Sequence, residues 1–177
     1  MQVHQSSEPT MSGTEAQLTM ASMADLRRNG MRNKPWRREQ RFYSFNTELS
    51  TRYADMDTER HINNVAVLTL HAEARTRLHL ALFGRDEWLA QTHTLRTAAL
   101  ETDFLEIAHY PAPIAAGVSL ITLEPRQYTL ATGLFQLGIC IGLQECRMGR
   151  WHEGEWTRLP DALHARLKRF GITEDAQ

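Results

Sequence analysis

The chain has 177 residues and nearly balanced charge, with 20 Lys and Arg against 21 Asp and Glu and a formal net charge of -1 at pH 7. This length suits one domain with a sizeable core, and the balance excludes a general attraction to nucleic acid or acidic membranes. Cys140 and Cys146 are too few for a disulfide scaffold and lack metal-ligand spacing. We therefore expect a small cytoplasmic enzyme or binding domain without a metal.

The N-terminal residues 1–40 contain few large apolar side chains and show no sustained hydrophobic period. This composition predicts a mostly disordered tail, a folded domain over 41–170 and a short C-terminal tail over 171–177. Basic residues outnumber acidic ones in the N-terminal tail, but it has no apolar segment of the kind found in secretory signals. We interpret it as a solvated tail.

The first predicted strand lies within 42–53, where aromatic and β-branched residues mix with polar ones. Its alternation places Phe45, Thr47 and Leu49 on one face. An acidic loop over 54–60 follows this strand.

A long helix follows the acidic loop. Asn63 or Asn64 suits its N-cap, the residues up to Phe83 include neither Gly nor Pro, and Gly84 suits its end. An apolar stripe with i, i+4 spacing runs along it, formed by Ala66, Leu70, Ala74 and Leu78. Such a helix is expected to be embraced by a sheet.

Four further strands are predicted after the helix, over 94–108, 115–124, 126–138 and 139–147, followed by a short helix over 159–170. The uncharged run over 127–144 contains Gln136 and three glycines, so two buried strands explain it better than a membrane span. One main helix with consecutive strands indicates an α+β fold with an antiparallel sheet.

Several motifs along the chain resemble one enzyme family. Arg52-Tyr53-Ala54-Asp55-Met56-Asp57, His61-Ile62-Asn63-Asn64 and Glu73-Ala74-Arg75 occur in order, and 126–130 and 159–163 match later motifs. Together they resemble the hotdog-fold acyl-CoA thioesterases of the 4-hydroxybenzoyl-CoA thioesterase type. The resemblance covers about 41–170 and implies a single hotdog domain. One departure is Arg60, where the family usually has Gly before the His; Arg60 must point outward or narrow the acyl pocket.

The resemblance also implies site residues. Asp57 matches the family's nucleophile or general base, and the oxyanion donor, a backbone N–H seven residues later, falls on Asn64. From the residues alone, an acidic loop beside the positive end of a helix can act on a bound carbonyl, although Asp57 could also serve only as a cap. His61 could assist proton transfer or bond to loop carbonyls.

Two further positions carry expectations with alternatives. The family counterpart of Glu73 faces the pocket, but Glu73 is also placed for an ordinary ion pair with Arg77. Arg126 matches a basic position of the family and is our nominee for the phosphates of CoA, against a solvated turn.

The sequence thus predicts hydrolysis of an acyl-CoA thioester, with no cofactor beyond the CoA of the substrate. The resemblance implies a homodimer or homotetramer with the pocket at the subunit interface, where Glu73 and Arg126 could serve the partner's pocket. The alternatives are a thioesterase for acyl carrier protein, a hotdog hydratase, and a non-catalytic acyl-CoA-binding protein. No nucleic-acid or membrane partner is expected.

Overall fold

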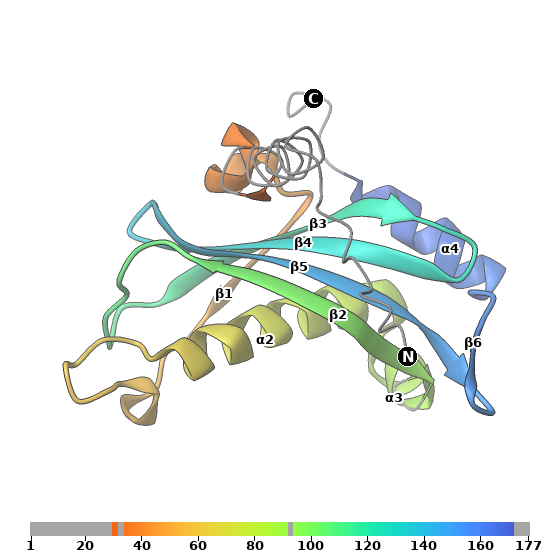
Figure 1. Ribbon diagram of the computed structural model, residues 1–177, viewed down its shortest axis with the longest axis horizontal. Coiled ribbons are helices and arrows are strands. Elements are labelled where there is room, and N and C mark those ends of the chain that lie inside the picture. The colour runs from red at the N-terminus through yellow and green to blue at the C-terminus, as the bar shows by residue number, and fades with distance from the viewer. Residues whose placement is uncertain (1–29, 32–33, 92–93, 172–177) are drawn as a thin grey trace, which may run out of the picture.

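The structure is a computed structural model that describes residues 30–31, 34–91 and 94–171. Its antiparallel sheet curves around one long helix, so the predicted α+β architecture is confirmed (Figure 1). The strands are β1 (Phe45–Leu49), β2 (Leu95–Phe104), β3 (Ile114–Leu123), β4 (Gln127–Gln136), β5 (Ile139–His152) and β6 (Glu155–Thr157). Their order is β1-β3-β4-β5-β2, with β6 paired to β5, so β1 and β2 are edges.

The described residues form three α-helices and four 3-10 turns, and the main helix begins and ends where predicted. They are α2 (Asn64–Phe83), α3 (Arg85–Gln91) and α4 (Asp161–Leu167), with 3-10 turns η2 (Pro35–Arg38), η3 (Gln40–Phe42), η4 (Tyr53–Asp55) and η5 (Lys168–Phe170). The Asn63 side chain caps α2 by accepting a hydrogen bond from the Ala66 amide at 2.8 Å. Gly84 ends the helix with a φ of 73°, a backbone conformation that favours glycine.

The main core lies between α2 and the inner face of the sheet. All four residues of the predicted apolar stripe are buried, as are Leu130 and Leu134 on β4. The uncharged run over 127–144 forms β4 and the start of β5, which confirms the two-strand interpretation. In the described part of the chain, no helix is long and apolar enough to cross a membrane.

Polar side chains are also buried under α2, which the sequence pattern did not predict. His71 and His79 are 0% and 1% exposed. Arg75 donates to Gln144, and His79 Nε2 lies 2.8 Å from the hydroxyl of Tyr128. Burial, with the charge of Arg75 as a second cause, lowers the pKa of His71 to about 3, and burial lowers that of His79 to about 4.

Part of the outer face of the sheet is covered by η2 and η3, the orange segment in Figure 1. Arg37 is fully buried there and forms an ion pair with Glu145 of β5. Tyr43 donates to the Arg37 carbonyl at 2.9 Å, and its ring lies so close to Gly117 that a Cβ there would meet it at 2.5 Å. This packing requires a glycine beneath the ring.

The packed chain therefore begins before the expected boundary at residue 41. Within 34–40, Arg37 stacks on Trp36 and pairs with a carboxylate, an arrangement that composition cannot indicate because it treats every charge as solvated. Residues 1–29 and 172–177, which include most of both predicted tails, lie outside the described residues. α3 and β6 are additional elements that the sequence pattern did not predict.

Candidate active site

The acidic loop closes on itself through the carboxylate of Asp57. Asp57 Oδ1 accepts two hydrogen bonds, from the amides of Glu59 and His61, each at 2.9 Å. The Asp57 amide in turn donates to the His61 carbonyl at 2.8 Å. Asp57 Oδ2 has no hydrogen-bond partner among the described residues, so the loop orients the carboxylate and leaves one oxygen available.

The first turn of α2 contains backbone amides without a hydrogen-bond acceptor in the described residues. The cap of Asn63 satisfies the Ala66 amide, and the Asn63 carbonyl accepts from the Val67 amide at 3.0 Å. The amides of Asn64 and Val65 have no acceptor within the ranges that the structure describes. Unpaired amides at the positive end of a helix form a site for a developing negative charge.

Asp57 and Asn64 line one pocket, which we call the loop pocket. Its volume is about 220 Å³, and it is lined by Asp57, His61, Ile62, Asn64, Val67, Phe104, Leu105, Glu106, Ile107, Ala108 and Ile141. The structure thus brings together three of the four residues predicted for catalysis. A carboxylate, a histidine and a helix N-terminus around one pocket match the requirements of acyl transfer without a covalent cofactor.

His61 has two polar neighbours in this region. Its Nδ1 lies 3.6 Å from the carboxylate of Glu59, and its ring meets that of His109 edge to face with centroids 5.3 Å apart. His61 and His109 also form an antiparallel backbone bridge. His61 therefore lines the pocket and also joins it to a second loop. One side chain position is thus compatible with both roles predicted for His61, proton transfer and support of the loop.

The second loop, 104–109, was missed by the motif analysis. The Ile62 amide donates to the Ala108 carbonyl at 2.8 Å. The Gln136 side chain accepts from the His109 amide and donates to the His109 carbonyl, each at 2.8 Å. Phe104 is a pocket wall, whereas Trp88 stacks on His79 in the core. The available signal was that four of the five residues in 104–108 are apolar, with Glu106 the exception, but only the fold shows that this segment lies opposite Asp57.

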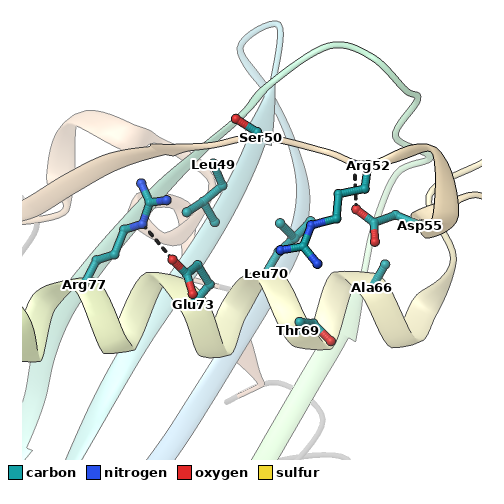
Figure 2. A pocket seen from close by; sticks show the side chains of 9 residues that line it. All are labelled: Leu49, Ser50, Arg52, Asp55, Ala66, Thr69, Leu70, Glu73 and Arg77. Atoms are coloured by element: carbon teal, nitrogen blue, oxygen red, sulfur yellow. Dashed lines mark hydrogen bonds and ion pairs between the residues drawn. The ribbon is translucent and has the colours of Figure 1, made fainter. Parts of the chain in front are cut away.

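Glu73 lies in a separate pocket, which we call the helix pocket. Figure 2 shows its lining of Leu49, Ser50, Arg52, Asp55, Ala66, Thr69, Leu70, Glu73 and Arg77. Glu73 Oε1 accepts from Arg77 Nε at 2.9 Å, and Arg77 also donates to the Glu48 carbonyl at 2.6 Å. Within one chain, Glu73 therefore forms the ion pair that its spacing allows, and it does not line the loop pocket.

Arg126 lies at the other end of the sheet. It precedes β4, whose last residue, Gln136, bonds to the loop beside His61. The nine residue steps from Gln127 to Gln136 span about 30 Å at the rise of an antiparallel strand. Within one chain, Arg126 is therefore too distant from the loop pocket to hold the phosphates of a bound thioester.

Arg60 adopts the left-handed conformation that the family's glycine would adopt easily, with a φ of 65°. Its amide donates to the Asp57 carbonyl at 3.1 Å, which closes the turn. A residue with a Cβ in this conformation costs about 1 kcal/mol. The Arg60 side chain is exposed and does not line the loop pocket, so it points outward and leaves the acyl pocket open.

Comparison with known proteins gives a fold and no sequence family. The chain matches no protein-family model and no curated protein. It is similar in structure to a thioesterase from Thermus thermophilus complexed with coenzyme A and Zn, with 19% identity, a TM-score of 0.66 and coverage of 73% of this chain and 95% of that chain. In the described residues, no group of three or more His, Cys, Asp or Glu is arranged to hold a metal ion.

Two further solved structures show the same similarity. A protein from Staphylococcus aureus in complex with CoA has 12% identity and a TM-score of 0.65, covering 73% of this chain and 86% of that chain. A 1,4-dihydroxy-2-naphthoyl-CoA thioesterase from Synechocystis has 13% identity and a TM-score of 0.63, covering 70% and 95%. The resemblance drawn from the motifs is thus matched in three dimensions, and the chain has the hotdog fold of these solved thioesterases.

Proposed function

We propose that this protein is an acyl-CoA thioesterase that hydrolyses an acyl-CoA to the free acid and CoA. The observation that carries the proposal is the arrangement of the loop pocket, where Asp57 has one unpaired oxygen and the Asn64 amide has no acceptor among the described residues. The resemblance in sequence and the thioesterases among the structural neighbours support this choice of reaction.

The reaction follows from these groups. The thioester carbonyl oxygen binds at the Asn64 amide, which stabilises the negative charge that develops on it. Asp57 Oδ2 either takes a proton from an attacking water or attacks the carbonyl carbon itself, giving an anhydride that water then hydrolyses. In both routes the C–S bond breaks and the CoA sulfur leaves as a thiolate that takes up a proton. We assign the transfer of that proton to His61, which lines the same pocket.

We also propose that the pocket is completed by a second copy of the chain. β2 is an edge strand whose residues 96–101 are all exposed in one subunit. Pairing of two such edges would cover this strand and could bring Glu73 or Arg126 toward the partner's pocket. Both cysteines are free thiols, in keeping with the proposed cytoplasmic location, and the proposed chemistry uses only the CoA of the substrate.

The test is thiol release from a panel of short, long and aromatic acyl-CoAs. We expect the wild type to turn over at least one of them, and Asp57→Asn, which keeps the shape and removes the charge, to lose about 100-fold or more in kcat with the fold intact. Binding of acyl-CoA without any thiol release would replace the proposal with the non-catalytic alternative.

A further inference from the structure

Arg60 is a strained residue whose side chain has no hydrogen-bond or ion-pair partner in the described residues. It is one of three residues other than glycine with positive φ in the described ranges, together with Leu137 and Glu153. A residue kept in such a conformation beside a candidate catalytic loop calls for a function of its side chain, because glycine would form the same turn with less strain.

The guanidinium of Arg60 is unpaired within the part of the chain that the structure describes. The neighbouring acid, Glu59, is directed to His61 Nδ1 at 3.6 Å. Arg77, by contrast, is committed to Glu73 and to a backbone carbonyl, and Arg37 is committed to Glu145. Arg60 therefore presents an available cation on the same five-residue turn that holds Asp57 and His61.

The position of this cation relative to the pocket indicates its ligand. Asp57 and His61 line the loop pocket, whereas Arg60, between them in sequence, is exposed and outside it. A thioester whose carbonyl lies at Asn64 and whose leaving group runs out of the pocket past this turn would carry that group toward Arg60. Coenzyme A carries phosphates on that group, and a guanidinium binds phosphate oxygens with two parallel hydrogen bonds.

We propose that Arg60 is a substrate-binding residue that contacts a phosphate of the CoA moiety and so selects phosphate-bearing thioesters. The proposal rests on the proposed function in that it uses the same pocket and substrate. It also assigns the phosphate contact within one chain to a residue on the catalytic turn, whereas Arg126 lies about 30 Å away along β4.

The experiment compares Arg60→Gln and Arg60→Gly with the wild type in calorimetric binding of CoA and of pantetheine, which lacks the phosphates. Arg60→Gln removes the charge and keeps the backbone strain, while Arg60→Gly suits the positive φ and should fold with a thermal midpoint within about 3 °C of the wild type. We expect both variants to weaken CoA binding about tenfold and to leave pantetheine binding unchanged.

Glu153→Gly is the matched control, since Glu153 is also an exposed residue with positive φ (47°) but lies in the turn between β5 and β6. It should leave binding of both ligands unchanged. With a hydrolysed substrate, the Arg60 variants should raise KM for the acyl-CoA and not for the N-acetylcysteamine thioester of the same acid, at unchanged kcat.

Equal CoA affinity in wild type and Arg60→Gln, equal weakening for CoA and pantetheine, or no binding of CoA to the wild type would each overturn the proposal. A different outcome would overturn the proposed function alone. If the wild type binds CoA in an Arg60-dependent way but hydrolyses no thioester, the phosphate contact stands and the thioesterase assignment falls.

Discussion

The two pockets beside α2 have similar volumes, about 220 Å³ each, and both hold charged residues, yet they differ in how those residues are used. In the helix pocket, Glu73 and Arg77 pair with each other, and Asp55 accepts from the Arg52 amide at 2.7 Å. Asp57, like Asp55 and Glu73, has one carboxylate oxygen without a partner among the described residues. The loop pocket adds to its carboxylate the Asn64 amide at the start of α2, which has no acceptor in those residues.

Under the proposed function, the number of charges does not identify the catalytic pocket. Groups that satisfy one another gain little from a substrate, because each new contact replaces an existing one. Groups that are oriented by part of their hydrogen bonds and left open on one side are available to a reacting carbonyl without reorganisation. The predictions below test this contrast.

The largest effect is expected from Asn64→Pro, which removes one open amide from the loop pocket. Proline is favoured at the first position of a helix, and Asn63 already has the φ of -68° and ψ of 157° that a residue before proline requires. The variant should therefore fold and lose about 10² to 10³ in kcat. Asn64→Ala, which keeps the amide, should lose far less; equal losses would show that the side chain matters instead.

A second prediction concerns the buried face of α2. The lowered pKa values of His71 and His79 mean that the unfolded chain, with a pKa near 6.5, binds protons that the folded chain excludes. Stability is therefore fully present above about pH 6.5 and falls as the pH drops, by about 2 kcal/mol per histidine between pH 7 and pH 5. Urea unfolding at both pH values measures this loss.

The control for the pH effect is His71→Leu. The ring nitrogens of His71 have no hydrogen-bond partner in the described residues, so replacing His71 with Leu removes no such bond. The drop in unfolding free energy between pH 7 and pH 5 should shrink by about half. An unchanged drop would mean that other groups destabilise the scaffold.

A smaller effect on activity is expected from Asn63, which connects the two pockets. Asn63 caps α2 beside the loop pocket and donates its Nδ2 to the carbonyl of Asp55, which lines the helix pocket, at 2.7 Å. Asn63→Ala should lower the free energy of unfolding by about 1 to 2 kcal/mol and reduce kcat less than tenfold. Chemical denaturation and steady-state kinetics measure both, and a loss of activity as large as that of Asn64→Pro would indicate a direct catalytic role.

Local patterns predicted much of this fold because they act within a few residues. The cap at Asn63, the end at Gly84 and the apolar stripe of α2 depend on neighbours in sequence, and all are present. The α3 and β6 elements, and the packing of Arg37 against Glu145, depend on partners distant in sequence that no local pattern identifies.

The candidate site divides in the same way. Asp57, His61 and Asn64 lie within eight residues, so their motif already places them around one helix N-terminus. The opposite wall, 104–108, is joined to them by the bond from Ile62 to Ala108 and by the neighbouring bridge between His61 and His109. Glu73 and Arg126 were drawn from the resemblance alone, and within one chain neither reaches the pocket. Their predicted roles depend on a second copy.

The most direct test of the contrast is a side-by-side measurement of kcat/KM for Asp57→Asn and Glu73→Gln on the best acyl-CoA of the panel. Both changes remove one carboxylate charge and keep the side-chain shape. We predict a loss of about 100-fold or more for Asp57→Asn and less than about threefold for Glu73→Gln. Equal losses, or a larger loss for Glu73→Gln, would contradict the assignment of catalysis to the loop pocket.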